Sequence, residues 1–260
     1  MGVAPKQLEV PEPTVAGRTP RLAADGECAT SGGAPEIRLA HDLSLVEAGS
    51  RRLLDIVVAT ALLIVLAPLM ALIALAIRTD SAGNAIFRQR RVGRGRREFT
   101  VLKFRTMYTD ANAAPHREYV RALIGDRRRP ERDRDRGGPE RGGLYKLSLD
   151  TRVTRVGRFL RSWSLDELPQ LVNVLQGKMA LVGPRPVIPY EVEMYPAEYL
   201  PRFDVKPGLT GLWQVSGRNV RTYEEMIHLD LEYAQAASLL LDLRILARTL
   251  PVVLGRQGVA

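Results

Sequence analysis

The fold class depends on residues 53–77, LLDIVVATALLIVLAPLMALIALAI, which form the one membrane-grade apolar stretch of the chain. As an α-helix, 25 residues would measure about 37 Å at 1.5 Å per residue, more than the roughly 30 Å hydrocarbon core of a bilayer. Length alone therefore allows a helix that spans a membrane. Pro68 lies inside the stretch, where it removes a backbone hydrogen bond and clashes with the preceding turn. We therefore expect a kink or a break there.

Both flanks of this segment are basic. The positive-inside bias keeps basic flanks on the cytoplasmic side, and two flanks on one side require a helix that enters the membrane and returns. From these features alone, a re-entrant helix broken at Pro68 and a spanning helix are equally favoured. The flanking arginines are Arg51 and Arg52 before the segment, and Arg78, Arg88, Arg90, Arg91, Arg94, Arg96 and Arg97 after it.

Charge is distributed unevenly along the 260 residues. Residues 1–50 hold 4 basic and 7 acidic side chains, which leaves 34 basic and 22 acidic side chains in 51–260. The excess of basic side chains in residues 51–260 predicts an anionic partner, such as nucleic acid, an acidic membrane surface or a phosphorylated substrate. The N-terminal segment is rich in Pro, Gly, Ala and charge, so residues 1–50 are predicted to be a disordered tail. Cys28 is the only cysteine, which excludes an intrachain disulfide.

Two segments that follow the apolar stretch differ in character. Residues 86–108 alternate charged with apolar and β-branched side chains around Gly93 and Gly95, which predicts a small β-hairpin. Its basic face would either be solvated or lie against anionic lipid headgroups. Residues 111–143 contain a run of mixed charge with Pro and Gly, which is typical of a mobile surface loop. That run lacks the aromatic side chains on which single-stranded nucleic acid would stack, so no nucleic-acid partner is expected.

The densest pattern lies in residues 151–177, where apolar residues at helical spacing predict a helix over 168–176. Ser164 could cap that helix, but Pro169 would then be its fifth residue and would cost a hydrogen bond. With Asp166 as the N-cap, Pro169 is the third residue, where no intrahelical partner is needed. We therefore expect Asp166 to cap the helix at the positive end of its dipole.

The C-terminal third contains two further helical patterns, over 222–236 and 238–254. Residues 178–189 hold three prolines and cannot form a regular helix. In the last helix, one apolar stripe suits either a membrane interface or packing in a soluble core. The stripe consists of Leu239, Leu243, Leu246, Leu250 and Val253.

Asp166 and Glu167 are adjacent acids that follow several arginines, a combination that suits phosphate chemistry. One carboxylate can accept a phosphoryl group covalently, and a second can hold Mg²⁺ together with substrate phosphates. Arginine binds phosphate oxygens through its planar fork, and Arg185 has a stiff backbone between Pro184 and Pro186. Acid pairs at helix starts also occur merely as caps, so these residues alone leave both interpretations open.

Three motifs, in this order, resemble those of the bacterial sugar transferase family: KFRTM (103–107), SLDELPQLVNVLQGKMALVGPRP (164–186) and KPGLTGLWQVSGR (206–218). The ending LDLRILARTLPVVLGRQGVA (241–260) is also similar to that family. The resemblance covers residues 51–260, apart from the charged loop. The family consists of monotopic phosphoglycosyl transferases, which move a sugar 1-phosphate from a UDP-sugar to polyprenyl phosphate and release UMP. This reaction starts the assembly of exopolysaccharide, capsule, O-antigen or other glycoconjugates.

The resemblance implies an α+β fold that is mainly helical. A re-entrant helix over 51–80, broken at Pro68, would anchor a monotopic domain that also contains a small β-hairpin and amphipathic interfacial helices. The domain over 81–260 would lie on the cytoplasmic face of the bacterial inner membrane, against anionic lipids, and a homodimer is one allowed state. Ala67 stands where the family often has a serine before the proline.

The same resemblance implies roles for individual residues. Asp166 would be the nucleophile that holds the sugar phosphate covalently, and Glu167 would act in catalysis by binding Mg²⁺. The predicted substrate-binding set consists of Arg161, Arg185, Lys103, Arg105 and Arg218.

Two other functions compete with this one. A membrane-anchored scaffold with a basic nucleic-acid-binding domain would share the charge and the apolar segment, but no helix-turn-helix or RNA-binding signature appears in the sequence. A soluble phosphatase that uses an aspartyl phosphate is disfavoured by the apolar segment 53–77.

Overall fold

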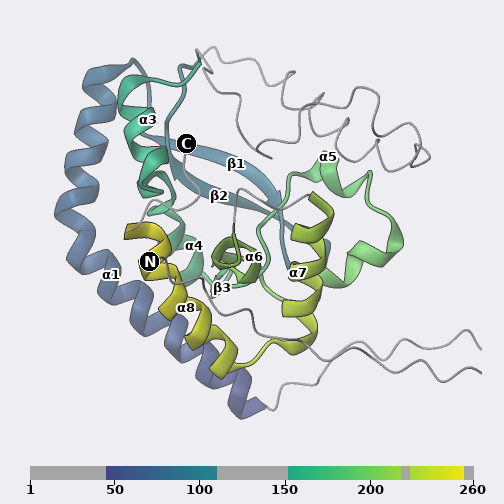
Figure 1. The fold of residues 1–260 in the computed structure, drawn as a ribbon. Coiled ribbons are helices and arrows are strands. Elements are labelled where there is room, and N and C mark those ends of the chain that lie inside the picture. Colours follow the sequence, from purple (N-terminus) through teal and green to yellow (C-terminus); the bar gives the residue numbers. More distant parts are fainter. Residues whose placement is uncertain (1–44, 110–151, 218–222, 255–260) are drawn as a thin grey trace, which may run out of the picture. The chain divides into compact units, whose positions relative to one another are not determined.

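The computed structural model describes residues 45–109, 152–217 and 223–254, and these residues are mainly helical (Figure 1). They also contain two sheets of two strands each. The predicted class, mainly helical with a small β-hairpin, is therefore confirmed. Most of the predicted N-terminal tail, the predicted loop 111–143 and Arg218 lie outside the described residues.

The apolar segment belongs to one long helix, α1 (Leu45–Asp80), which begins at Leu45 and not at the predicted residue 51. Of the kink or break predicted at Pro68, the break is wrong, because the helix continues through this residue. A proline removes one hydrogen bond and displaces the preceding turn, but the bonds on either side hold the helix together. The ribbon of α1 instead changes direction along its length (Figure 1).

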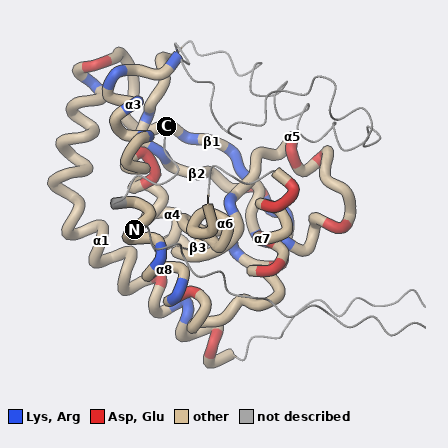
Figure 2. The backbone as a smooth tube through the Cα atoms, in the orientation of Figure 1, with Lys and Arg blue, Asp and Glu red and all other residues tan. Residues whose placement is uncertain are grey.

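Among the described residues, α1 is the one helix that is long and apolar enough to cross a membrane. Its central stretch carries no charged residue (Figure 2). Many of its large apolar side chains are exposed, which a helix in water would not tolerate in such number. They include Leu53, Val57, Ile64, Val65, Leu72 and Leu75.

The start of α1 is attached to the rest of the domain by charged side chains. Arg51 donates through Nε to Oδ2 of Asp242 at 2.7 Å. Arg52 donates to the backbone oxygen of Val174, also at 2.7 Å. Asp55, which is buried, accepts a hydrogen bond from a backbone amide in the second sheet, described below.

The end of α1 is attached to the same domain. Asp80 accepts a hydrogen bond from the backbone amide of Val156 at 3.2 Å. Arg105 donates to the backbone oxygens of Ser81 and Ala82, at 2.7 and 2.5 Å. Both ends of the apolar helix therefore contact one and the same folded unit.

The predicted β-hairpin is confirmed. Strand β1 (Ile86–Val92) pairs antiparallel with β2 (Glu98–Phe104), and a 3₁₀ turn, η1 (Arg94–Arg96), joins them. Gly95 in this turn has a φ of 64°, a conformation that glycine adopts without steric cost. The hairpin lies behind the helices that carry the candidate site (Figure 1).

Three short helical segments follow the hairpin in the described chain. They are α3 (Arg155–Ser162), the 3₁₀ turn η4 (Leu165–Glu167) and α4 (Gln170–Leu175). The helix predicted over 168–176 is thus shorter, and Gly177 terminates it with a φ of 74°.

A second sheet joins two segments that are rich in Pro and Gly. Strand β3 (Ala180–Val182) pairs parallel with β4 (Gly208–Thr210). A Cβ atom on Gly208 would lie 2.1 Å from the backbone nitrogen of Gly183, so the chains approach closely there because neither residue has a side chain. Between the strands lie α5 (Pro189–Val192) and the 3₁₀ segment η5 (Ala197–Phe203).

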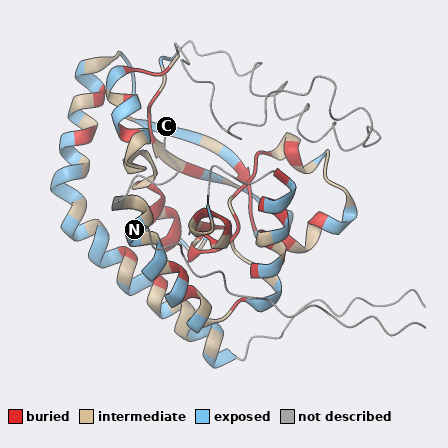
Figure 3. Cartoon of the chain, viewed as in Figure 1, coloured by how far each residue is buried: buried red, intermediate tan, exposed pale blue. Residues whose placement is uncertain are grey.

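The remaining helices are α6 (Leu212–Val215), α7 (Tyr223–Ala236) and α8 (Leu239–Leu254). Buried residues concentrate in α4, α6 and β3 (Figure 3). In α8 the predicted apolar stripe is divided: Leu246 packs against the core, whereas Leu243 and Leu250 are 45% and 66% exposed. The buried face of α8 carries Asp242 and Ile245. Of the two expected environments, packing in the core is therefore wrong for Leu243 and Leu250.

Candidate active site

Asp166 and Glu167 lie in the 3₁₀ turn η4. The prediction that Asp166 caps the following helix is wrong, because Pro169 occupies the N-cap position of α4. Ser164 adopts a left-handed conformation with φ 55°, and its backbone oxygen accepts from the amide of Glu167 at 3.3 Å. This extra turn displaces both acids from the helix end, and it leaves Pro169 where a missing amide costs little.

The ammonium of Lys103 pairs with one of the two acids. Its Nζ lies 2.8 Å from Oε1 of Glu167, and both side chains are largely buried. Lys103 reaches this position from β2, so the hairpin and the turn η4 meet at the ion pair. The structure thus brings Lys103, which the resemblance assigns to substrate binding, together with Glu167.

The carboxyl group of Asp166 has a raised pKa. Burial is the main cause, since it disfavours the charged form, and the neighbouring charge of Glu167 acts in the same direction. The positive charges of Lys103 and Arg161 oppose both effects. Arg161 therefore lies within electrostatic reach of Asp166, as predicted, and it donates from Nε to Oγ1 of Thr106 at 2.9 Å.

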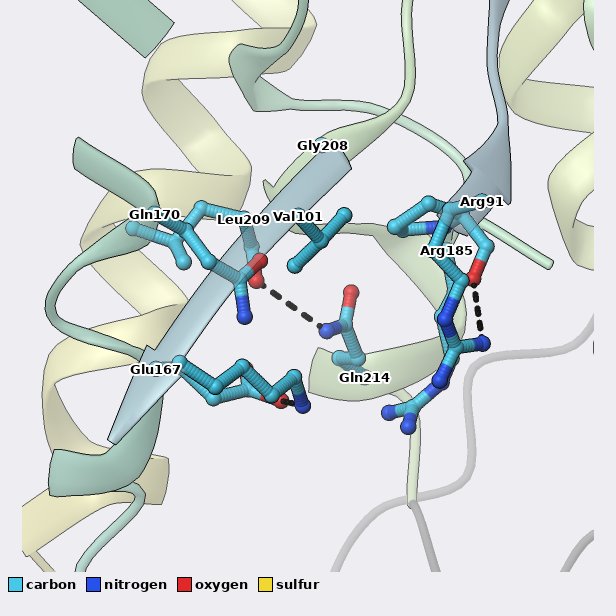
Figure 4. Close-up of a pocket in the computed structure, with 10 residues that line it drawn as sticks. Arg91, Val101, Glu167, Gln170, Arg185, Gly208, Leu209 and Gln214 are labelled. Carbon is cyan, nitrogen blue, oxygen red and sulfur yellow. Dashed lines mark hydrogen bonds and ion pairs between the residues drawn. The ribbon is translucent and has the colours of Figure 1, made fainter. Parts of the chain in front are cut away.

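A pocket with about 280 Å³ of empty volume opens beside this turn. Figure 4 shows Glu167 and Arg185 on opposite sides of it, with Gln214 between them and Arg91 beside Arg185. The pocket brings together three of the predicted site residues and several that the sequence did not suggest. Its lining consists of Arg91, Val101, Lys103, Glu167, Gln170, Arg185, Pro186, Gly208, Leu209 and Gln214.

A buried ion pair between Arg202 and Asp230 holds the backbone of Arg185 in place. Arg202 donates to the backbone oxygen of Arg185 at 3.1 Å and to the carboxylate of Asp230. Asp230 is fully buried, which raises its pKa to about 6 in spite of the opposing charges of Arg202 and Arg185. No pattern in the sequence connects these residues, since they come from three separate segments.

Of the predicted substrate-binding residues that the structure describes, Arg105 and Arg161 do not line this pocket. Arg105 is buried, and its guanidinium is engaged by the carbonyls that end α1, which is a structural contact. Lys103 lies in β2, whereas Arg105 follows the end of this strand at Phe104, and the two side chains have different partners. Arg218 lies outside the described residues.

The residues suit a Mg²⁺ ion that is shared with substrate. In 45–109, 152–217 and 223–254, no group of three or more acids, histidines or cysteines could hold a metal alone. Mg²⁺ commonly takes one or two protein carboxylates and completes its shell with phosphates and water. Asp166 and Glu167 supply that number beside a cationic pocket, although Glu167 would then share its contact with Lys103.

The sequence of the chain is similar to those of known proteins. Residues 46–256 match the family described as bacterial sugar transferase. The chain is 42% identical over 208 residues to a "UDP-galactose-lipid carrier transferase" of Erwinia amylovora, of which it spans 41%. It is 40% identical over 213 residues to "Exopolysaccharide production protein ExoY" of Sinorhizobium fredii and covers 87% of that protein. It is 41% identical over 230 residues to a "UDP-glucose:undecaprenyl-phosphate glucose-1-phosphate transferase" of Caulobacter vibrioides and covers 74% of it.

A carboxylate pair on a tight turn, with Glu167 lining a pocket that also contains cations, is typical of proteins that handle phosphorylated substrates. The chain belongs to the bacterial sugar transferase family. The resemblance stated from its motifs is therefore confirmed. The chain spans about two fifths of the length of some relatives, including the Erwinia protein. The matches to the Erwinia, Sinorhizobium and Caulobacter proteins each cover 80% or more of this chain.

Proposed function

We propose that this chain transfers a sugar 1-phosphate from a UDP-sugar to polyprenyl phosphate and releases UMP. The observation that carries the proposal is the turn of Asp166 and Glu167 beside a pocket lined by Lys103 and Arg185. Names of relatives support the substrates, since they include a UDP-galactose-lipid carrier transferase and a UDP-glucose:undecaprenyl-phosphate glucose-1-phosphate transferase. The product would start an exopolysaccharide or a related surface glycan.

The reaction would proceed in two displacements. A carboxylate oxygen of Asp166 attacks the phosphorus that bears the sugar, an O–P bond forms, and the bond from that phosphorus to UMP breaks. A phosphate oxygen of the polyprenyl phosphate then attacks the same phosphorus, and the carboxylate of Asp166 leaves. Arg161, Lys103 and Arg185 would balance the negative charge on the phosphoryl oxygens in both steps.

Mg²⁺ would supply further charge neutralisation at the diphosphate when it is bound. Glu167 is the residue proposed to hold it, and Lys103 would keep the carboxylate of Glu167 oriented at 2.8 Å. Arg185 would bind phosphate oxygens with its planar fork from the opposite side of the pocket.

We also propose that α1 enters the cytoplasmic leaflet and returns to the same side. A straight helix of 36 residues would measure about 54 Å, yet both of its ends are hydrogen-bonded to one domain. A spanning helix would place one end across the membrane from the active site. The exposed leucines of α8 would lie in the interface with the anionic headgroups, at the height where polyprenyl phosphate presents its phosphate.

The chemistry is tested with Asp166→Asn in the full chain. The variant keeps the side-chain shape but lacks the nucleophilic charge, so it should release no UMP from a UDP-sugar in the presence of polyprenyl phosphate. Asp204→Asn, at an exposed carboxylate outside the pocket, is the matched control and should retain wild-type turnover. A sugar-phosphate adduct mapped to another residue would contradict the assignment, as would near-normal turnover in Asp166→Asn.

The topology is tested by thiol labelling of intact cells. With Cys28→Ser as background, Val10→Cys provides a single reactive thiol before α1. A re-entrant helix predicts that an impermeant reagent labels it only after the cells are permeabilised. Labelling of intact cells would establish a spanning helix and exclude re-entry. Pro68→Ala in the same background should increase labelling, because it removes the residue that bends the helix.

A further inference from the structure

A second cavity, with about 370 Å³ of empty volume, adjoins the active-site pocket. The two share Arg91, Arg185 and Pro186, so they lie next to each other. Neither Asp166 nor Glu167 lines the second cavity. Its other lining residues are Val187, Glu191, Arg202 and Met226.

Glu191 is the unusual group in this cavity. Its side chain belongs to α5 and the residue is only 7% exposed. Within the described residues, the hydrogen bond that its carboxylate receives is a long one, 3.5 Å from the hydroxyl of Tyr223. A buried carboxylate is costly unless it accepts hydrogen bonds, so a ligand with a donor group would satisfy it.

A directed chain of hydrogen bonds shows that Glu191 acts as an acceptor. Arg202 donates to the hydroxyl of Tyr195 at 2.9 Å, and this hydroxyl lies 2.6 Å from that of Tyr223. A carboxylate can only accept, so the Tyr223 hydroxyl donates its one proton to Glu191, and the Tyr195 hydroxyl therefore donates to Tyr223. Burial raises the pKa of Tyr223, which keeps its proton in place for that last bond.

The cavity combines this acceptor with flanking cations and apolar walls. Arg91 and Arg185 line both this cavity and the active-site pocket, Arg202 is a third lining cation, and Pro186, Val187 and Met226 are apolar. The imide edge of uracil has one N–H donor between two carbonyl acceptors. A carboxylate with neighbouring arginines complements that edge, and apolar side chains suit the faces of a planar ring.

The location of the cavity favours the base over the transferred sugar. In an in-line displacement the leaving group departs on the side opposite the nucleophile. The sugar is bonded to the phosphorus that Asp166 attacks, whereas uracil is separated from it by a second phosphate and a ribose. Figure 4 places Arg185 across the pocket from Glu167, and Arg185 also lines the second cavity, whereas Glu167 does not.

From these observations we infer that the second cavity binds the uracil base of the nucleotide donor, with Glu191 accepting a hydrogen bond from N3–H. This inference rests on the proposed function, because it takes the donor to be a uridine nucleotide. Glu191 is then a determinant of nucleotide specificity that takes no part in the chemical step.

The test is calorimetric titration of the full chain in detergent with UMP. Glu191→Ala should weaken UMP binding by about tenfold to a hundredfold, the usual range for one hydrogen bond to a charged group. Glu193→Ala, an exposed carboxylate two residues along that does not line the cavity, should bind UMP like the wild type. N3-methyl-UMP, which lacks the donor, should bind the wild type more weakly than UMP by a similar factor, and Glu191→Ala should not distinguish the two ligands.

Each contrary result has a defined meaning. Equal affinity of the wild type for UMP and N3-methyl-UMP overturns the inference, and this comparison needs no variant that might be unstable. Unchanged UMP affinity in Glu191→Ala, with altered preference among UDP-sugars, overturns it in favour of the sugar. In both cases the wild type still releases UMP from its UDP-sugar; absence of that release would instead refute the proposed function.

Discussion

Gly157→Ala should displace the helix that carries Arg161. Gly157 lies in α3, where an added Cβ would be 2.1 Å from the backbone oxygen of Thr106 and 2.7 Å from its carbonyl carbon. Ordinary van der Waals contact is roughly 3.5 Å, so a shift of about 1 Å is required. The obstacle is backbone, which cannot rotate away. The same oxygen of Thr106 accepts from the amide of Thr154 at 3.0 Å, so a shift of α3 would also stretch that bond.

The magnitudes favour a net loss. Replacing glycine by alanine inside a helix gains up to about 1 kcal/mol, whereas overpacking costs about 1–3 kcal/mol and a weakened hydrogen bond about 1 kcal/mol. The larger effect should be on activity, because Arg161 moves with α3. A misplacement of about 1 Å costs on the order of a hundredfold in rate. We therefore expect a drop of that size in kcat/KM and a lower Tm for Gly157→Ala.

The matched control is Gly49→Ala in α1, where an added Cβ has no neighbour within 4 Å. It should leave kcat/KM unchanged and Tm equal or slightly higher. UMP release by both variants, measured at equal concentrations of folded protein, provides the comparison. A wild-type kcat/KM in Gly157→Ala would contradict the prediction. It would mean either that α3 accommodates the added methyl group without moving Arg161, or that Arg161 does not contribute to turnover.

Three further predictions concern the pocket itself. Lys103→Gln removes a cation that lowers the pKa of Asp166, so this already raised pKa should rise further. Because the nucleophile must be ionised, the acid limb of the profile of kcat/KM against pH should move to higher pH; an unshifted limb would mean that another group controls it. Glu167→Gln should increase the Mg²⁺ concentration needed for half-maximal rate, and an unchanged Mg²⁺ titration would exclude Glu167 as the ligand. Arg185→Lys should not restore the rate that is lost in Arg185→Ala, since an ammonium lacks the planar fork; full activity of the lysine variant would disprove bidentate binding.

The parts of the fold that the sequence predicted correctly are those specified by neighbouring residues. The hairpin follows from alternating side chains around two glycines, and Gly177 ends α4 as expected. The extent of α1 was less clear, because helical residues from Leu45 onward precede the apolar run and are stabilised by contacts with distant parts of the chain. A propensity argument about Pro68 could not decide between a kink and a break, because the hydrogen bonds on either side keep the helix continuous through this exposed residue.

The site was predicted in part for the same reason. The adjacent acids and the stiff segment around Arg185 are visible as short motifs, and the structure places Glu167 and Arg185 on one pocket. The left-handed conformation of Ser164, which moves Asp166 from the helix end, has no clear sequence signal because serine rarely adopts it. Gln214 and Arg91 reach the pocket from elements that are far apart in sequence, so only the tertiary fold reveals them.

The charged start of α1 has a consequence for biosynthesis. Arg51 is separated by 191 residues from its partner Asp242, and Arg52 by 122 residues from Val174. The ribosome therefore delivers the apolar helix to the membrane well before the groups that satisfy its arginines have been translated. Headgroups or water must solvate these arginines in the interval, until α8 has been translated and Asp242 completes the junction. A nascent chain that stalls before α8 would have an inserted helix whose Arg51 lacks Asp242, which would expose it to quality-control proteases.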